Sequence, residues 1–559
     1  MKRILAVFVV CLLSACATDK SPVQVVKEAI APASDKPLIE GLTPGAFVPS
    51  TLAQGEERDL AQRRSVGPGY VHAEALERYL QTIRAKLLAA SGVTGVPGRV
   101  RVLADGSFSA FSTADGNVYV AMGWFDNFGN EDEIAALMAH ELAHVLLKHH
   151  TSDVVSKMQK KTLSYLTYGV EAQKQFSVLV NAFNTQTGSP TPAPTNSKSS
   201  GTSTTNQSTL SKLFESASHA IPSSDASNAT SKPAAGQKGG TAPTSKTEQD
   251  EKRLLRRIQW SIDVTDKAIL PAWGRTQEHD ADLLGVDLLV AAGYNKSAMS
   301  SMLAKLKEAE EQRVADDKSR QTQFSMVAAE LKDGNWDEAA KIAFSDVLSS
   351  IAESHPPTGA RIDDVDAYVI KFYAKTPLKP FNVDAWRRVK NEPTTTAFLG
   401  NYGKSFSAEQ MIRKADLKVA YRLAKQGATG VTARESYTNW VAALSAEANG
   451  ANGDARVYYQ NAISAREPIN AAYEAYVTSL ERNGNYGAAL VESEKASKIF
   501  GDVPSWTVTR IRLLRKSGNA TAAKKLEIEC GTETPDYRRA CGDAGNTPLG
   551  GKGGTAKRP

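Results

Sequence analysis

Residues 140–144 read His-Glu-Leu-Ala-His, in the middle of an apolar segment with helical periodicity. Asn130 stands just before this segment and Glu133 follows it three positions later, a pairing typical of a helix N-terminus. The sequence therefore predicts a helix that carries both histidines. Because residues four apart lie on one helical face, His140 and His144 can hold one metal ion between them.

The residue types around this pair indicate zinc. Neutral imidazole nitrogen suits Zn²⁺, and a catalytic zinc site has three protein ligands and keeps a fourth position for water. Glu141, which stands next to one ligand, has the chemistry of a general base. An ordinary helix is the alternative, but the chain holds only 8 histidines in 559 residues, so this spacing rarely arises by chance. We expect one Zn²⁺ per chain.

The third ligand must come from elsewhere in the chain. His150 lies six residues after His144, but no glycine at position 147 turns the chain back toward the pair. His149 and His150 are therefore interpreted as residues of the helix end, on roughly the other side of the helix from His144. A more suitable source lies downstream.

Residues 278–282 read Glu-His-Asp-Ala-Asp and begin a second apolar helical segment. Glu278 is the candidate third ligand. Asp282, four residues later on the same face, is the candidate carboxylate that orients a ligand histidine from behind. Alone, such an acidic cluster is more often a solvated helix face. Its combination with the histidine pair favours a shared metal site.

The first residues have the pattern of an export signal. Lys2 and Arg3 precede an apolar stretch, residues 4–13, that is too short to cross a bilayer. Residues 13–16 read Leu-Ser-Ala-Cys and resemble the lipobox of bacterial lipoproteins, in which the cysteine is lipidated. We therefore expect Cys16 to be the mature N-terminus and to hold the protein at a membrane surface. A plain signal peptide is the alternative.

Length and composition limit the remaining possibilities. A chain of 559 residues, 41% of them hydrophobic, is long enough for two or three domains. The formal net charge of +6 is too small to indicate nucleic-acid binding. No later apolar run approaches the length of a membrane-spanning helix.

The C-terminal part has an internal period of 34 residues. Small residues recur at this spacing, namely Gly450, Gly484 and Gly518, Ala455, Ala489 and Ala523, and Ala462 and Ala496. The spacing resembles tetratricopeptide repeats, in which small residues let paired helices pack closely, and an irregular helical bundle is the alternative. Beyond the repeats, Cys530 and Cys541 are either a disulfide or two free thiols.

These patterns predict an α+β, mostly helical zincin-type metallopeptidase domain with a small sheet, followed by an all-α domain. The expected boundaries are 1–16 for the signal peptide, 17–60 for a flexible tether, 61–380 for the metallopeptidase domain, 395–530 for the repeats and 531–559 for a disordered tail. A Ser-, Thr- and Pro-rich stretch at 185–250 is expected to be a disordered insertion in the first domain.

The motifs together resemble the HtpX, Oma-type and CAAX-prenyl-endopeptidase-like zinc metallopeptidases. In that family the histidine motif is followed by E-x-[DE]-A-D and then a glycine, which residues 278–282 and Gly285 match. Residues 109–112 are similar to the family's Asn-Ala-Phe-Ala segment, although Ser109 replaces the asparagine. Residues 354–362 are similar to the His-Pro and Arg-Ile segment of soluble members. The lipobox and the repeats are similar to those of periplasmic, BepA-like lipoproteins.

This resemblance implies a zinc-dependent endopeptidase of the bacterial cell envelope, periplasmic and lipid-anchored at the outer membrane. The implied site residues are the metal ligands His140, His144 and Glu278, the orienting residue Asp282, and the catalytic residues Glu141, His355 and Arg361. His355 or Arg361 would stabilise the oxyanion, or His355 would occupy the fourth metal position. Polypeptide substrates would add as a strand along residues 117–122, an edge strand in the family.

The helical repeats imply protein partners. Concave faces of repeat domains bind peptides and proteins, so the repeats would recruit substrate or dock on the outer-membrane assembly machinery. The alternative function is a chaperone-like or scaffold protein that binds partners through its repeats while its zinc site is structural. Glu141 argues against that alternative, because a structural zinc site needs no general base.

Overall fold

The computed structural model describes residues 35–50, 53, 55–151, 275–316, 358–500, 504–530 and 535–550. The expected signal peptide, the lipidation site Cys16, the insertion at 185–250 and His355 lie outside these residues. In the described part of the chain, helices dominate and the sheets are small. None of the described helices has the length and apolar character that crossing a membrane requires.

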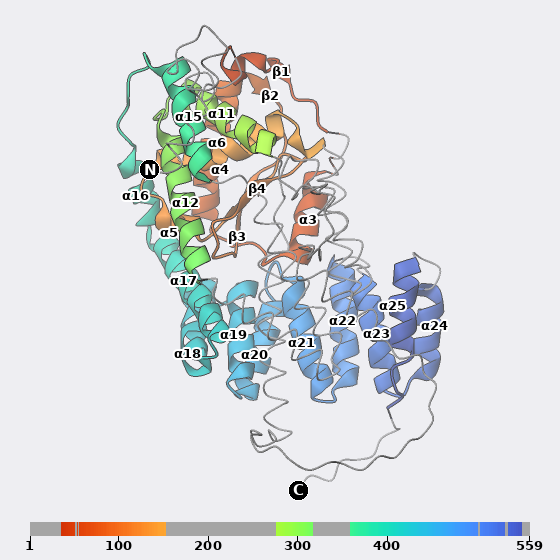
Figure 1. Cartoon of the computed structure of the whole chain (residues 1–559). Coiled ribbons are helices and arrows are strands. Elements are labelled where there is room, and N and C mark those ends of the chain that lie inside the picture. The colour runs from red at the N-terminus through yellow and green to blue at the C-terminus, as the bar shows by residue number, and fades with distance from the viewer. Residues whose placement is uncertain are drawn as a thin grey trace, which may run out of the picture.

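The first half of the molecule places helices around a small sheet (Figure 1). Its helical elements are η1 (Leu38–Gly41), α3 (Glu56–Val66), α4 (Glu74–Ser91), α5 (Trp124–Asn127), α6 (Glu131–Leu146), η2 (His149–Thr151), α11 (Arg275–Ala291), α12 (Ala298–Asp316) and α15 (Thr358–Tyr373). Its strands are β1 (Gly45–Ala46), β2 (Val93–Thr94), β3 (Val100–Leu103), β4 (Ala110–Ser112) and β5 (Val118–Ala121). The zincin-type α+β expectation is thus met in its helical content and its small sheet.

β5 is the middle strand of the three-stranded sheet, whose order is β3-β5-β4. β3 runs parallel to β5, whereas β4 runs antiparallel to it. The expectation that residues 117–122 form an edge strand is therefore wrong, because this fully buried strand has hydrogen-bonded neighbours on both sides. The outer side of β3 is partly covered, since Tyr70 bridges to Leu103. Among the described residues, no further strand pairs with β4, which is the edge.

α6 forms where the sequence predicts it and is buried on every side. Asn130 caps the helix by accepting a hydrogen bond from the Glu133 N–H (3.0 Å). All residues from Asp132 to Leu146 are buried, because α4, α11, α12 and β4 pack around this helix. The histidine pair is therefore fixed in the core of the first half.

The segment from residue 35 to α3 corrects the expectation of a flexible tether at 17–60 for the part of that range that the structure describes. β1 pairs with β2, and η1 lies against α11 and α15. The Leu38 N–H donates to Tyr368 Oη (2.8 Å), and the Ile39 N–H donates to Asp287 Oδ2 (2.9 Å). Apolar side chains of η1 also pack against the core. These partners are remote in sequence, so the composition of the segment does not reveal that it is ordered.

The second half is a row of helices along the lower part of Figure 1. It begins with α16 (Val383–Lys390), which lies beside the first half, and the row itself consists of α17 (Pro393–Arg413), α18 (Leu417–Gly427), η4 (Gly430–Thr432), α19 (Ser436–Ala448), α20 (Asn452–Ile463), α21 (Asn470–Arg482), α22 (Tyr486–Phe500), α23 (Pro504–Lys516), α24 (Ala520–Cys530) and α25 (Pro535–Gly545). Consecutive helices pack against one another along the row.

The 34-residue period corresponds to pairs of helices. Gly450, Gly484 and Gly518 each follow the first helix of a pair, with φ of 77°, 75° and 80°. This left-handed conformation favours glycine, and it lets the next N–H bond back to the helix, as from Ala451 to Ala446 O (2.8 Å). The repeated alanines, Ala455, Ala462, Ala489, Ala496 and Ala523, are all buried. The tetratricopeptide assignment itself stays a prediction.

Ion pairs link each helix pair to the next. Arg482 pairs with Glu447, and Lys516 Nζ lies 2.8 Å from Glu481 Oε1. The two acids are 34 residues apart, and so are the two bases. Glu447 also accepts a hydrogen bond from Tyr459 Oη (2.9 Å). The row is therefore held together by contacts between neighbours that recur with the sequence period.

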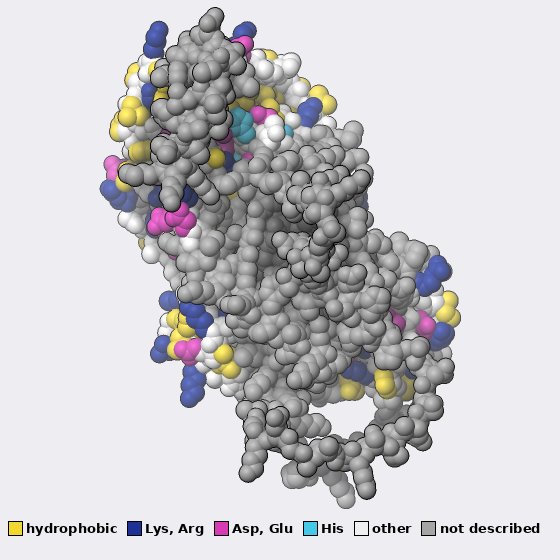
Figure 2. Space-filling view, viewed as in Figure 1, with side chains coloured by type: hydrophobic (Ala, Val, Ile, Leu, Met, Phe, Trp, Pro, Cys, Tyr) yellow, Lys and Arg dark blue, Asp and Glu magenta, His cyan; other side chains and the backbone are white. Residues whose placement is uncertain are grey.

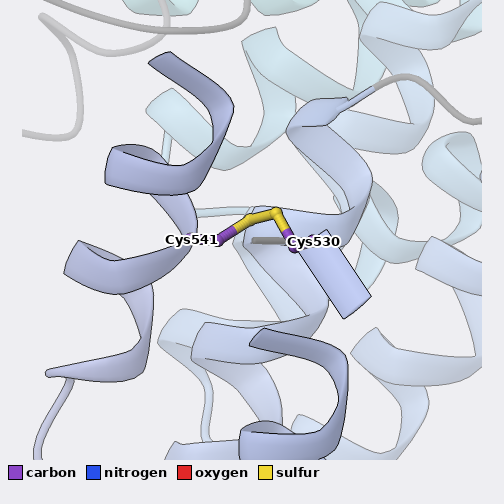
Figure 3. Close-up of a disulfide and its surroundings, with 2 residues drawn as sticks. All are labelled: Cys530 and Cys541. Atoms are coloured by element: carbon purple, nitrogen blue, oxygen red, sulfur yellow. A yellow bond between two sulfur atoms is a disulfide. The ribbon is translucent and has the colours of Figure 1, made fainter. Parts of the chain in front are cut away.

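A disulfide between Cys530 and Cys541 ties α24 to α25 (Figure 3). Both cysteines are buried and pack in a small core with Ile511. The expectation that 531–559 is a disordered tail is therefore wrong at residues 535–545. The covalent link and this core order a segment whose composition is typical of a tail.

Five residues form a charged cluster between the two halves, which we call the His72 cluster. His72 Nδ1 lies 3.0 Å from Glu435 Oε1, and its Nε2 lies 2.8 Å from Glu467 Oε2. Arg101, on β3, pairs with the same Glu467 (3.0 Å) and with Glu77 (2.9 Å). Charged groups of the first half thus bind acids that precede α19 and α21.

Candidate metal centre

Side chains from α6 and α11 converge on one point in the first half. The Nε2 atoms of His140 and His144 are 3.2 Å apart, and carboxylate oxygens of Glu278 lie 3.7 Å and 3.6 Å from them. All three residues are buried, and they are the group that could hold a metal ion in the described part of the chain. Figure 2 shows histidine and acidic side chains close together in the upper part of the visible face.

These separations fit a zinc ion. Ligand atoms about 2.0–2.1 Å from a tetrahedral ion lie about 3.4 Å from one another, close to the three distances observed. Two imidazoles and one carboxylate are also a donor set of catalytic zinc sites. Burial, and then the charge of His140, lower the pKa of His144 well below its ordinary value, which keeps this ligand neutral. The residues present therefore suit the metal that the motif implies.

Gly285 lets α11 approach α6 closely beside the histidines. A Cβ at this position would lie 2.4 Å from Met299 Cε and 3.4 Å from the backbone nitrogen of His140. Because glycine has no side chain, the two helices meet without a spacer at this point. The close contact brings Asp282 and Glu278, about one and two turns earlier on α11, within reach of the imidazoles.

Asp282 and Arg361 support the ligands from behind. Asp282 Oδ1 lies 2.8 Å from His140 Nδ1, the ring nitrogen that faces away from the ligand trio. Arg361 donates to both Asp282 oxygens (2.8 and 2.9 Å), and its Nη1 lies 3.2 Å from Glu278 Oε2. Although burial raises the pKa of Asp282, the charge and hydrogen bonds of Arg361 hold it well below its usual range. The ionised carboxylate fixes the His140 tautomer that leaves Nε2 for a metal.

Glu141 is a further buried carboxyl group beside the trio. Burial has the largest effect on the pKa of Glu141 and raises it, and the charge of His140 opposes this rise. The charge of Glu278 raises the pKa further, so that it reaches about 7. The nearby hydroxyl of Ser112, on β4, opposes the rise. A carboxyl group that titrates near neutrality can both accept and return a proton.

His149 is a residue at this site that sequence reasoning missed. Lys148 adopts a φ of 55°, so the chain turns immediately after α6 although neither Leu147 nor Lys148 is glycine. The turn brings His149 Nδ1 to 2.9 Å from His144 Nδ1. Burial, and then the charge of His150, lower the pKa of His149 to about 4. A left-handed lysine leaves no recognisable signal in the sequence, so this contact could not be predicted from it.

The structure brings together most of the residues that the sequence singles out. Those found around the same point are His140, Glu141, His144, Glu278, Asp282 and Arg361. His355 lies outside the described residues, and its role stays a prediction. The individual catalytic roles of the others also stay predictions.

Comparisons with known proteins agree with this geometry. The Beta-barrel assembly-enhancing proteases of Escherichia coli (strain K12) and Shigella flexneri are each 24% identical to the chain over 127 residues. That region is 22% of this chain and spans only 26% of the relatives' own length. Residues 74–369, more than half of the chain, match Peptidase family M48, and this range includes the whole ligand trio. The chain therefore belongs to peptidase family M48.

Proposed function

We propose that the protein is a zinc-dependent endopeptidase of the bacterial cell envelope that cleaves misfolded or misassembled envelope proteins. The observation that carries the proposal is the convergence of His140, His144 and Glu278, with Glu141 beside them. Zinc held by these three ligands would polarise the scissile carbonyl and activate water near neutral pH.

Glu141 is the general base in this mechanism. It takes a proton from the attacking water and passes it to the leaving amine as the peptide bond breaks. Burial keeps its pKa near neutrality, so both transfers are accessible at physiological pH. Asp282 meanwhile holds the ring of His140 in its binding orientation through Nδ1.

Arg361 acts as a positioning residue in this proposal rather than at the oxyanion. Its guanidinium already binds the carboxylates of Asp282 and Glu278, which leaves few of its donors for a reacting carbonyl. We therefore keep His355 as the residue that would stabilise the oxyanion or occupy the fourth metal position.

β4 is the strand along which we expect substrate to bind. Residues 109, 111 and 113 direct their backbone hydrogen bonds toward β5. Because antiparallel pairing alternates, the N–H and C=O groups of Ala110 and Ser112 point away from β5. An extended substrate segment can add at that edge. Ser112 also lies near Glu141, so a segment bound there passes close to the general base.

The export pattern at residues 1–16 supports the proposed envelope location, and so does the name of the relatives, which refers to beta-barrel assembly. We extend that setting to this chain. A lipid on Cys16 would hold it at the periplasmic face of the outer membrane, and the helical repeats would recruit polypeptides or dock on the outer-membrane assembly machinery.

Cleavage of casein by purified protein tests the proposal. The wild type should cleave it, a chelator should abolish cleavage, and added zinc should restore it. Glu141→Gln should lower the rate by at least about 100-fold, because a general base contributes that much, while keeping about one zinc per chain. Glu74→Gln is the matched control, since that side chain is 72% exposed and should leave the rate unchanged.

Two outcomes would count against this function. Undiminished cleavage by Glu141→Gln would remove the general base from the mechanism. A wild type that holds zinc and captures polypeptides without cleaving them would instead support the chaperone-like or scaffold function. Measuring bound zinc by mass spectrometry separates loss of the metal from loss of the base.

A further inference from the structure

The connection between α15 and α16 displays apolar side chains to solvent. We call residues 370–388 the α15–α16 edge, which comprises the end of α15, the connecting loop and most of α16. The exposed fractions are 70% for Ile370, 66% for Leu378, 36% for Phe381 and 38% for Val383. Several large apolar side chains exposed within one short stretch indicate an interaction surface.

The backbone beneath these side chains is held from the protein side. The Asn382 N–H donates to a carboxylate oxygen of Asp132 (2.6 Å), and the amide of Asn295 donates to the carbonyl of Lys379. Lys296 donates to the carbonyls of Tyr373 (2.9 Å) and Thr376 (2.7 Å). Pro377 and Pro380 further restrict φ on both sides of Leu378. The loop therefore presents its apolar side chains from a fixed backbone, which lowers the entropy lost on binding.

Basic side chains accompany the apolar ones. The edge contains the basic residues Lys371, Lys375, Lys379, Arg387 and Arg388 and the single acid Asp384. Asp384 pairs with Arg387 (2.8 Å), whereas Lys375 and Arg388 have no ion-pair partner in the part of the chain that is described. In Figure 2, Lys and Arg side chains lie on the flank on which α16 lies, together with some Asp and Glu side chains. Exposed apolar side chains and an excess of basic ones within one short stretch match the chemistry of an anionic lipid surface.

The N-terminal segment meets the fold on the same helix. The Leu38 N–H donates to Tyr368 Oη, less than one turn before Ile370 on α15. Cys16 lies 22 residues upstream of Leu38, so the chain between them can reach at most about 80 Å. The lipid anchor proposed at Cys16 would therefore keep the edge within reach of a bilayer. This step rests on the proposed envelope location, whereas the chemistry of the edge does not.

We propose that the α15–α16 edge is a membrane-contact surface that binds anionic phospholipid headgroups, with Leu378 and Phe381 in the interface. A second copy of the chain fits less well, because two such edges would bring like charges together. An acidic protein would satisfy the charge, but it would not account for the adjacent attachment of the N-terminal segment. Contact at this edge would also place the bilayer next to α15, the helix that carries Arg361.

Co-sedimentation with lipid vesicles tests the surface directly. The mature chain from residue 17, which has no lipid, should bind vesicles of phosphatidylglycerol mixed with phosphatidylcholine and should bind pure phosphatidylcholine far less. Lys375→Glu with Arg388→Glu should weaken binding by about 25-fold or more, since each basic residue near an anionic surface contributes about fivefold. Leu378→Ser with Phe381→Ser should weaken it as well.

Matched controls keep the test decisive. Lys524→Glu with Lys525→Glu changes the charge equally on α24, and Val457→Ser with Val491→Ser removes exposed valines from α20 and α22. Both controls should bind like the wild type. Absence of binding to anionic vesicles, or equal losses in controls and edge variants of unchanged melting temperature, would overturn the proposal. Binding is measured without substrate or zinc, so its failure is distinct from failure of the peptidase proposal.

Discussion

At the scale of single residues, the metal centre depends on the guanidinium of Arg361, which lies between buried carboxylates. Arg361 is 7% exposed, and its partners Glu278 and Asp282 are 2% and 1% exposed. Burying two carboxylates without a counter-charge would be costly, and Arg361 offsets that cost before any metal is bound. The same guanidinium sets the charge on Asp282 and so the orientation of His140.

Replacing Arg361 by Met distinguishes a positioning role from an oxyanion role. We expect the free energy of unfolding to fall by about 3–5 kcal/mol, since one partner of a buried ion pair is lost. Zinc affinity should also fall, by about 10–100-fold, as it does when the partners of ligands are removed. Arg387→Met, at an exposed position, is the control. Normal stability and zinc affinity with strongly reduced cleavage would instead assign Arg361 to the oxyanion.

Four of the residues that the sequence identified share one property, which is local spacing, whereas Arg361 was expected from the family resemblance. His140 and His144, and likewise Glu278 and Asp282, lie four apart on their helices, and this spacing is visible in any sequence. The contact of His149 with His144 instead depends on a left-handed lysine. Contacts that depend on a rare backbone conformation cannot be predicted from the local spacing of residues.

At the scale of elements, the approach of α11 to α6 decides whether the third ligand reaches the histidines. Gly285→Ala places a Cβ against Met299 Cε, which must move. We expect a loss of stability of about 1–3 kcal/mol, as for other overpacked cores, together with weaker zinc binding. Adding Met299→Ala should make the combined loss smaller than the sum of the two.

Gly453→Ala on α20 provides the comparison for this experiment. Nothing lies within 4 Å of a Cβ at that position, so the change should be neutral or slightly stabilising in a helix. Chemical denaturation and competition with a zinc chelator measure both quantities. If Gly285→Ala behaves like Gly453→Ala in both assays, close helix packing is not what positions Glu278.

Elements were predictable from the sequence where their signals are local. The cap at Asn130 appears at the expected position, because a cap involves only residues of one turn. The central place of β5 was not predictable, since it depends on which strands pair with it. The ordered segment before α3 and the helix α25 were missed for the same reason, because remote partners or a disulfide stabilise them.

At the scale of the whole molecule, the His72 cluster couples the two halves. Burial alone would lower the pKa of His72, but hydrogen bonds and charges of Glu435 and Glu467 raise it to about 9. Hydrogen bonds from His72 and Arg101 outweigh burial at Glu467 and lower the pKa of that acid to about 2. The contact therefore contains a protonated histidine at neutral pH.

The stability of the contact should depend on alkaline pH. Because the folded-state pKa of His72 is raised, its contribution is fully present below about pH 6.5 and is lost as pH rises through about 9. We expect the free energy of unfolding to fall by no more than about 3 kcal/mol over this window. His72→Gln should remove that part of the pH dependence in denaturant titrations at each pH. An identical pH profile in the variant would show that His72 does not provide the coupling.

The attachment of η1 to Asp287 has a mechanical consequence. Asp287 lies on α11, the helix that supplies Glu278, and it accepts hydrogen bonds from the Ile39 N–H and from Tyr368 and Tyr373. A force that pulls on the chain upstream of Leu38 is therefore borne first by α11 and α15. Tension on the N-terminus is transmitted straight to the two helices that hold the carboxylate ligand and its arginine.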